Sequence, residues 1–389
     1  MITQPRRAIF VINSLTSGGA ERVFVDLLSA LRSRLGGYET HLILLDRETS
    51  RHQPPDWVSL YCCDARFSVL RSVSALTQRI RALEPDVVVS FLTRANVAAL
   101  IASRLAGAPC VISERVHTTS HLGRGLGAAT QRAMVRMTYP LASRVVAVSE
   151  AIRTDLSTRY GVPADRIAVV HNPTDVDRIL ERAAEEPSLD MGPDDVLAIG
   201  RLTENKNFAS LIEAFARSGL PGRLVIAGEG PLRADLLACA RRAGAADRVR
   251  LPGYVANPFP LLRAAKMFAS SSLAEGFPNA IVEALAVGCP VVATDCLSGP
   301  REILQAQGTD AVTVGACGIL VPVDDAPSMS EGLRLAADPS LTRILVERGR
   351  RRAAEFSVAT SVERYWSVIE DAMRGRRGRA AGFNARRAA

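Results

Sequence analysis

Residues 8–35, AIFVINSLTSGGAERVFVDLLSALRSRL, decide the fold. The run 8–13 is short, apolar and rich in β-branched side chains, which is typical of a buried strand. A glycine turn follows, and from residue 22 the apolar side chains recur at helical spacing. A strand, a tight turn and a helix in this order form a βα unit, the building block of a parallel sheet.

The same alternation continues along the chain in two series. Strand-like apolar runs lie at 40–46, 86–91, 109–113 and 143–149, and then at 196–200, 223–228, 249–253, 267–271, 290–294 and 318–322. Strands that are apolar throughout are typical of parallel sheets buried on both faces. Between the two series, residues 178–195 are polar, acidic and broken by proline and glycine, which indicates a linker.

We therefore predict an α/β protein with two doubly wound parallel-sheet domains, which suits a chain of 389 residues. The predicted divisions are a first domain at 1–177, a linker at 178–195 and a second domain at 196–355. An amphipathic C-terminal helix follows at 356–373 and a basic flexible tail at 374–389. Such sheets bind ligands at the carboxyl ends of their strands, so we expect a cleft between the two domains.

Composition narrows the class of protein. Hydrophobic residues make up 48% of the chain and charged residues 23%, which is typical of globular domains. No apolar run approaches the roughly 20 residues that span a bilayer, and the N-terminal apolar block is too short for a signal peptide. Seven cysteines without C-x-x-C spacing indicate neither a disulfide framework nor a zinc site. We predict a cytoplasmic protein.

The formal charge of +8 would suit a nucleic acid, an anionic membrane or a phosphorylated substrate. Much of the excess lies in the tail from Arg374 and in the stretch 124–144, where apolar residues recur at helical spacing between arginines. That stretch fits an ordinary half-buried helix or a helix on a membrane surface. We expect no nucleic-acid partner and keep contact with the inner face of the plasma membrane as a hypothesis.

Two glycines, Gly18 and Gly19, follow the first strand. They would let the backbone approach an anion at the start of the next helix. A plain turn would use the same residues. The full dinucleotide fingerprint G-x-G-x-x-G is missing from the sequence, which argues against a dehydrogenase.

The segment GRLTENKNF, residues 200–208, follows the first strand of the second series. Arg201 offers a planar fork for phosphate oxygens, and Lys206 offers a mobile point charge. Together they suit a diphosphate, although a solvated surface pair would look the same. Lys206 and Lys266 are the only lysines of the chain.

The segment EGFPNAIVEA, residues 275–284, places two carboxylates around a helix start. Pro278 suits the first turn of a helix, so Glu275 should lie in the preceding loop and Glu283 on an early turn. The helix start comprises Phe277, Pro278, Asn279 and Ala280. Free backbone N–H groups are expected at each of these residues except Pro278, which has none. A sugar that carries phosphate would meet both carboxylates and these amides. The alternative is that Glu283 faces solvent and Glu275 only complements the helix dipole.

These segments resemble those of the retaining glycosyltransferases of family 4, which have the GT-B fold of two Rossmann-like domains with a C-terminal helix that crosses back. The resemblance rests on SGGAERV, SERVH (113–117), GRLTENKNF, VIAGEGPLR (225–233) and EGFPNAIVE, the E-x7-E motif of that family. TDCLSGPREIL, residues 294–304, is similar to a segment of members that transfer amino sugars and galactose. The chain looks closest to hexosyltransferases of polysaccharide and lipid-linked glycan synthesis.

The resemblance implies a role for each matching residue. Arg201 and Lys206 would hold the donor diphosphate and replace a metal. Glu283 would bind the ribose, Glu275 the hydroxyls of the transferred sugar, and His117 the sugar near the reacting centre, although a lone histidine is as often structural. The remaining donor contacts would come from the glycine loop, the helix start and the backbone near the base, at Gly18, Gly19, Phe277, Pro278, Asn279, Ala280, Tyr254 and Val255.

The implied reaction is retaining transfer of a hexose or N-acetylhexosamine from a nucleotide-diphosphate sugar to a glycan or lipid-linked acceptor. No metal or other cofactor is expected. UDP-linked sugars are preferred to GDP-mannose on similarity alone. Two alternatives stay open: a GT-B sugar-nucleotide epimerase, which would turn over without an acceptor, and a non-catalytic protein that binds a sugar nucleotide or a membrane.

Overall fold

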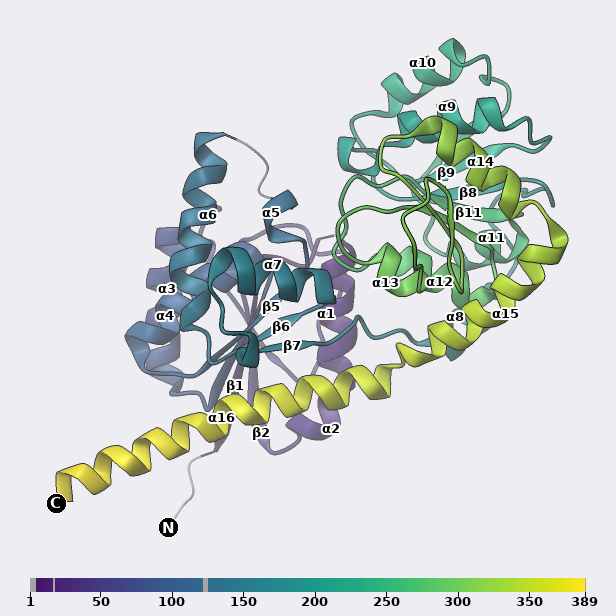
Figure 1. Cartoon of the computed structure of the whole chain (residues 1–389). Coiled ribbons are helices and arrows are strands. Elements are labelled where there is room, and N and C mark those ends of the chain that lie inside the picture. The colour runs from purple at the N-terminus through teal and green to yellow at the C-terminus, as the bar shows by residue number, and fades with distance from the viewer. Residues whose placement is uncertain (1–4, 17, 122–124, 389) are drawn as a thin grey trace. The chain divides into compact units, whose positions relative to one another are not determined.

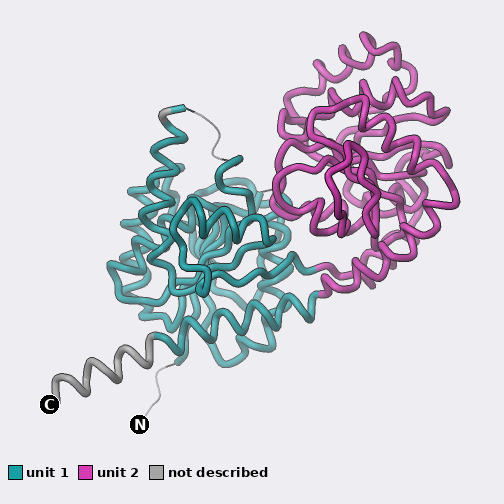
Figure 2. Tube along the Cα trace, in the orientation of Figure 1, with its two compact units in different colours: residues 1–173, 358–389 teal, residues 174–357 magenta. Residues whose placement is uncertain are grey.

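The computed structural model describes residues 5–16, 18–121 and 125–388, and it describes their side chains except at 121, 126 and 376–388. The chain divides into two compact units (Figure 2). Unit 1 comprises residues 1–173 and 358–389, and unit 2 comprises residues 174–357. Each unit is built on one seven-stranded sheet with helices on its faces (Figure 1). This architecture confirms the predicted pair of doubly wound α/β domains.

Unit 1 has seven parallel strands in the order β3-β2-β1-β4-β5-β6-β7. Their bounds are β1 Arg6–Ile12, β2 Tyr38–Leu44, β3 Ser59–Cys62, β4 Val87–Phe91, β5 Cys110–Glu114, β6 Arg144–Ala147 and β7 Ile167–Val169. The α-helices are α1 Gly19–Ala30, α2 Arg32–Leu35, α3 Val69–Leu83, α4 Thr93–Ala106, α5 Thr118–His121, α6 Leu126–Thr138, α7 Glu150–Tyr160 and α16 Val358–Ala388, with short 3-10 helices at Tyr139–Leu141 (η1) and Ala164–Arg166 (η2).

Unit 2 has the strand order β10-β9-β8-β11-β12-β14-β13, in which only the β13–β14 pair is antiparallel. The strands are β8 Val196–Ile199, β9 Leu224–Ala227, β10 Val249–Gly253, β11 Met267–Ser270, β12 Val291–Thr294, β13 Thr313–Val314 and β14 Ile319–Val321. The helices are α8 Val176–Ala183, α9 Phe208–Ser218, α10 Arg233–Arg242, α11 Phe259–Ala264, α12 Asn279–Val287, α13 Pro300–Leu304, α14 Ala326–Ala336 and α15 Pro339–Glu355, with a 3-10 helix at Glu204–Lys206 (η3).

The central strands are apolar because both of their faces are covered. All five residues of β4 are buried, and its neighbour β1 is buried from Ala8 onward. On one face, Phe10 and Phe91 pack with Phe24 of α1 and with side chains of α16. The core of unit 1 therefore includes the last helix of the chain.

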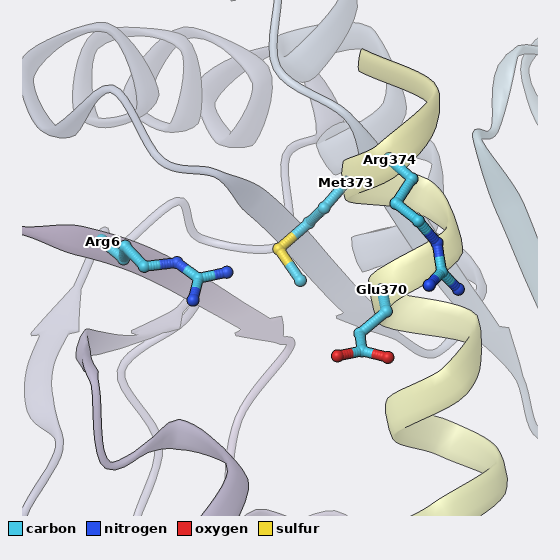
Figure 3. Close-up of a pocket in the computed structure, with 4 residues that line it drawn as sticks. All are labelled: Arg6, Glu370, Met373 and Arg374. Carbon is cyan, nitrogen blue, oxygen red and sulfur yellow. The ribbon is translucent and has the colours of Figure 1, made fainter. Parts of the chain in front are cut away.

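Helix α16 returns to unit 1, as predicted for the C-terminal helix. Tyr365, Trp366 and Ile369 belong to the core of that unit. The helical backbone runs on to Ala388, where the sequence suggested a frayed tail, and its alanines and arginines are strong helix formers. A small pocket between the start of β1 and α16 is lined by Arg6, Glu370, Met373 and Arg374 (Figure 3). It lies at the amino end of β1, away from the strand ends where ligands are expected.

The segment 178–195, predicted to be a linker, lies within unit 2, and α8 occupies its beginning. Asp175 caps this helix, because its side chain accepts a hydrogen bond from the Arg178 N–H. At the other end of the segment, the buried Asp195 carboxylate binds the Arg223 guanidinium at 2.7 Å and two backbone N–H groups. These bonds fix the entry of the chain into β8.

The strand orders show where the chain stops adding strands on one side of each sheet and begins to add them on the other. In unit 1 the chain builds outward from β1 to β3 and then returns to place β4 on the other side of β1. In unit 2 the same reversal separates β8 from β11. The loops after two such strands diverge, and they leave a crevice at the carboxyl edge of the sheet.

Glycines allow close backbone packing at that edge of unit 2. A Cβ atom on Gly228 would lie 1.8 Å from the carbonyl oxygen of Gly200, which directly follows the neighbouring strand β8. We predict that Gly228→Ala lowers the free energy of unfolding by about 2 kcal/mol or more, because backbone atoms must move apart. Urea denaturation followed by circular dichroism measures this loss.

Gly37→Ala is the matched control, because a Cβ atom there meets nothing within 4 Å. It should change the stability by less than about 1 kcal/mol. Equal effects of the two substitutions would contradict the role given to the close approach at Gly228.

Candidate functional site

The centre of the candidate site in unit 2 is an ion pair between the loops that follow β8 and β11. Lys206 Nζ donates to Glu275 Oε1 at 2.5 Å. The same oxygen accepts a hydrogen bond from Ser272 Oγ at 2.6 Å. The Lys206 side chain is 26% exposed and that of Glu275 is 15% exposed. The pair therefore spans the reversal point of the sheet, and its ammonium group remains accessible to an anion.

Backbone and side-chain hydrogen bonds hold the two loops together. The backbone carbonyl of Asn205 accepts a hydrogen bond from the Leu273 N–H at 2.8 Å. The side-chain Nδ2 of Asn205 donates to the Ala274 carbonyl at 2.9 Å. Ser271 Oγ donates to the Lys206 carbonyl at 2.7 Å. The side chain of Lys206 also covers Gly200, where a Cβ atom would lie 3.1 Å from its Cε. Lys206 is therefore fixed at both ends.

A third loop, after β12, supports the loop that carries Glu275. Ser298 Oγ donates to the carbonyl oxygens of Glu275 at 2.6 Å and Gly276 at 3.0 Å. Gly299 has a φ of 98°, and a Cβ atom there would lie 2.4 Å from Pro278 Cδ. Only glycine fits this contact. Apart from the similarity of 294–304 to family members, no sequence pattern pointed to these supporting residues.

The helix that carries the second glutamate begins as predicted. Pro278 precedes the first helical residue, Asn279, and Ala280 is partly exposed on the first turn. Glu283 is only 7% exposed, so it does not face solvent. Phe277 is buried against Phe356, with ring centroids 5.1 Å apart.

The remaining predicted residues of unit 2 lie at the same edge of the sheet. Arg201 is exposed directly after β8, and its guanidinium forms no hydrogen bond or ion pair with any described residue. Tyr254 and Val255 follow β10, and Tyr254 is 60% exposed. The loops after β8, β10 and β11 thus bring a free arginine, a lysine, two carboxylates and a helix start to one edge. This combination of groups suits a phosphorylated polyol.

In unit 1, the glycine turn leads into a helix start. Gly18 is the N-cap residue of α1 with an extended backbone, and Gly19 is the first helical residue. A Cβ atom on Gly18 would clash with the carboxylate of Glu21, whose flexible side chain can move. The turn therefore places α1 with its amino end at the carboxyl edge of the sheet, where an anion is favoured.

His117 lies at the same edge of unit 1, in the loop after β5. Its side chain is 9% exposed. Nδ1 is 3.1 Å from Ser120 Oγ, and Nε2 is 3.9 Å from Asp155 Oδ1. Since Asp155 also accepts from Thr119 Oγ1 at 2.6 Å, the imidazole is oriented by a network within the unit.

The residue that ends β5, Glu114, is fully buried and was not singled out from the sequence. It accepts hydrogen bonds from Tyr139 Oη, from Thr93 Oγ1 at 3.3 Å and from the Arg115 N–H at 3.1 Å. Burial raises the pKa of Glu114 to about 6, although the hydrogen bond from Tyr139 lowers it in part. The carboxyl group thus orients the first peptide of the loop that leads to His117.

This raised pKa predicts a pH dependence of stability. Because the folded pKa lies above the ordinary 4.5, the folded protein binds more protons, and stability is lost as pH rises through this window. Relative to wild type, Glu114→Gln should gain about 2 kcal/mol between about pH 4.5 and pH 7.5. Urea denaturation followed by tryptophan fluorescence measures this, because both tryptophans, Trp57 and Trp366, lie in unit 1.

Glu150→Gln is the control, because Glu150 is an exposed carboxylate on α7. Its stability relative to wild type should stay nearly constant over this range. Parallel curves for wild type and Glu114→Gln would refute the raised pKa.

Within the described residues, no group of three or more His, Cys, Asp or Glu side chains could hold a metal ion. The structure gathers the predicted residues into two sets, each at the carboxyl edge of its own sheet. One set comprises Arg201, Lys206, Tyr254, Val255, Glu275, Phe277, Pro278, Asn279, Ala280 and Glu283 in unit 2, and the other comprises Gly18, Gly19 and His117 in unit 1.

Comparison with known proteins gives consistent matches along the chain. The family described as "Glycosyltransferase Family 4" matches residues 17–178, and "Glycosyl transferases group 1" matches residues 193–338. A Campylobacter jejuni enzyme named N-acetylgalactosamine-N,N'-diacetylbacillosaminyl-diphospho-undecaprenol 4-alpha-N-acetylgalactosaminyltransferase is 31% identical over 89% of this chain and 94% of its own length. The lipopolysaccharide core biosynthesis glycosyltransferase LpsE of Rhizobium meliloti is 29% identical over 90% of this chain and 96% of its own length.

Solved structures share the fold at lower identity. HepE of Anabaena, determined with UDP and glucose, has a TM-score of 0.72 and 20% identity, covering 94% of this chain and all of its own. Sucrose-phosphate synthase of Thermosynechococcus elongatus has a TM-score of 0.74 and 17% identity, covering 98% of this chain and all of its own. These likenesses confirm the predicted GT-B fold.

Proposed function

The chain belongs to glycosyltransferase family 4 and is a glycosyltransferase, and from this premise we propose that it transfers a hexose or N-acetylhexosamine from a UDP-sugar to a lipid-linked glycan. The observation that carries the proposal is the Lys206–Glu275 pair at the reversal point of the unit 2 sheet, at the same edge as the exposed Arg201. Two cations and a helix start meet the needs of a diphosphate.

In the proposed reaction, the bond between the sugar anomeric carbon and the donor diphosphate breaks. Arg201 and Lys206 stabilise the negative charge that develops on the departing UDP, which is often the largest catalytic contribution. The acceptor oxygen attacks the same face of the sugar, and its proton passes to a phosphate oxygen of the leaving group. The configuration at the anomeric carbon is therefore retained, without a protein nucleophile.

The carboxylates and the histidine position the donor. Glu283, buried on α12, accepts hydrogen bonds from the ribose hydroxyls, and Glu275 accepts them from the transferred sugar. When a diphosphate binds, the Lys206 ammonium has three donors and can serve both Glu275 and phosphate. His117 contacts the sugar near its anomeric carbon. The glycine turn at Gly18 and Gly19 approaches the diphosphate, and the backbone at Tyr254 and Val255 contacts the base.

The nature of the substrates is supported by the relatives. The Campylobacter jejuni relative is named for transfer of N-acetylgalactosamine to a diphospho-undecaprenol glycan. HepE, which shares the fold, was determined with UDP-glucose. We therefore place a UDP-linked hexose or N-acetylhexosamine first among donors, and a polyprenyl-diphosphate glycan first among acceptors. The reaction needs no metal, because the two cations neutralise the diphosphate.

Donor binding tests this proposal. We predict that UDP-GalNAc, UDP-GlcNAc or UDP-glucose binds in the presence of EDTA and that Glu283→Ala weakens binding at least about tenfold, because a charged hydrogen bond is lost. Isothermal titration calorimetry measures the affinities, with GDP-mannose as the competing donor class. Glu213→Ala is the control, because Glu213 is an exposed glutamate on α9 of the same unit.

Three results would contradict the proposal. No binding of any UDP-sugar would remove the donor site, and a requirement for metal would remove the role given to the two cations. Consumption of the donor without an acceptor, with a changed sugar as the product, would indicate an epimerase.

We also propose that the protein acts at the cytoplasmic face of an anionic membrane, where a polyprenyl-linked acceptor resides. No helix in the described ranges is long and apolar enough to cross a bilayer. Helix α6 carries Arg132 and Arg136 and no acidic residue, and Met137 beside them is 75% exposed. A helix with this composition suits an anionic interface.

Vesicle co-sedimentation measures the membrane contact. We predict binding to vesicles that contain phosphatidylglycerol, weaker binding to neutral phosphatidylcholine vesicles, and loss of binding at high salt because the charges are screened. Arg136→Ser combined with Met137→Ser should weaken binding, whereas Arg153→Ser on α7 should not. Indifference to lipid charge would contradict the proposal.

A further inference from the structure

One buried cation has no part in the reaction as proposed. Arg115 lies between Glu114 and the His117 loop and is only 5% exposed. Its Nη1 donates to Tyr365 Oη at 3.0 Å and is 3.4 Å from Ser113 Oγ, and its Nη2 donates to Asn172 Oδ1. The guanidinium also lies 5.5 Å from the ring centre of Phe91. Each of these contacts lies within unit 1.

The partners of Arg115 belong to the two segments by which the chain leaves and re-enters unit 1. Asn172 lies just before the chain passes into unit 2 at residue 174. Tyr365 lies on α16, which begins at Val358 as the chain returns. Figure 2 shows the two changes of colour next to each other. A single side chain therefore holds both crossings of the chain.

The two crossing segments are also bonded to each other. The Thr174 N–H donates to the Phe356 carbonyl at 2.8 Å, and Thr174 and Ser357 form a parallel bridge. On the unit 1 side, Ser361 Oγ donates to the His171 carbonyl at 3.1 Å. One hydrogen bond and one isolated bridge thus pair the two segments at the point where the chain enters and leaves unit 2.

The segment that leaves unit 2 touches the candidate donor site within that unit. Phe356 packs edge-to-face on Phe277, which follows Glu275 by two residues. The guanidinium of Arg352 lies 4.5 Å from the centre of the Phe356 ring. Within unit 2, Phe356 therefore packs on the loop that carries Glu275. Within unit 1, Tyr365 and Asn172 bind Arg115.

Burial of the Arg115 guanidinium costs desolvation that lowers its pKa, and the charge of Glu114 opposes this only in part. An apolar side chain of similar length would avoid that cost. What arginine adds is geometry, because its planar fork binds several acceptors in fixed directions. We propose that Arg115 is a positioning residue that joins the His117 loop to both crossing segments, so that the loop moves with the connection between the units. This inference rests on the proposed transferase function only for its effect on turnover.

Kinetics and donor affinity separate this role from a general loss of structure. Arg115→Met should lower kcat for transfer from the bound UDP-sugar by about tenfold to a hundredfold, because a small displacement of a positioned group is costly. The dissociation constant of UDP should change by less than about twofold, because none of the proposed UDP contacts involves Arg115 or its partners. Leu76→Ala, in the buried face of α3, is the control for destabilisation of unit 1 and should leave kcat unchanged when folded.

Hydrogen–deuterium exchange gives a reading that does not depend on turnover. Arg115→Met should accelerate amide exchange both at 115–118 and at 171–175. Leu76→Ala should not accelerate exchange in these two segments together. If Arg115→Met does not fold, Tyr365→Phe decides, because it removes only the hydroxyl that binds Ser113 and Arg115. It should accelerate exchange at 115–118 and lower kcat severalfold.

Two results would overturn the inference. One is a folded Arg115→Met protein with wild-type kcat and exchange. The other is a parallel loss of kcat and UDP affinity, as expected for simple destabilisation. If the wild type itself shows no transfer, the proposed function is wrong, and the exchange data still decide the role of Arg115.

Discussion

The Lys206–Glu275 ion pair is the interaction on which the functional part of this structure depends. A parallel sheet that reverses its strand order leaves two diverging loops, and here the pair closes the gap between the loops after β8 and β11. The surrounding bonds from Asn205, Ser271 and Ser298 fix both loops so that the pair keeps its position. An ammonium group held in this way is charged, accessible and already oriented, which a diphosphate site requires.

The sequence predicted the features that depend on local pattern. Continuous apolar strands and helical spacing predicted two doubly wound domains, because burial on both faces leaves a simple signature. The acidic break at 178–195 did not mark the boundary, because this segment lies within unit 2. Strands β3, β7 and β13 were missed or only partly recognised, because they are short and lie at sheet edges, where exposed positions weaken the pattern. The extent of α16 and the start of α8 were also not predicted.

The site was predictable where one residue carries the chemistry, as with Arg201, Lys206, Glu275 and Glu283. It was not predictable where the role arises from packing. Nothing in the run SERVH distinguishes the buried Glu114 and Arg115 from surface charges, because their partners Tyr139, Asn172 and Tyr365 are distant in sequence. The need for glycine at position 299 likewise arises from its contact with Pro278, which only the folded chain reveals.

If the two loops of unit 2 hold the donor diphosphate, UDP must bind next to Lys206, and the two lysines of the chain allow this to be measured directly. Lys206 lies at the carboxyl edge of the sheet, whereas Lys266 precedes β11 at the opposite edge. Protein labelled with 13C at lysine Cε gives one signal from each, and UDP is titrated while both are followed by NMR. We expect a saturable shift of the Lys206 signal and no change at Lys266. If UDP saturates the protein and the Lys206 signal does not move, the diphosphate does not bind at the Lys206–Glu275 pair.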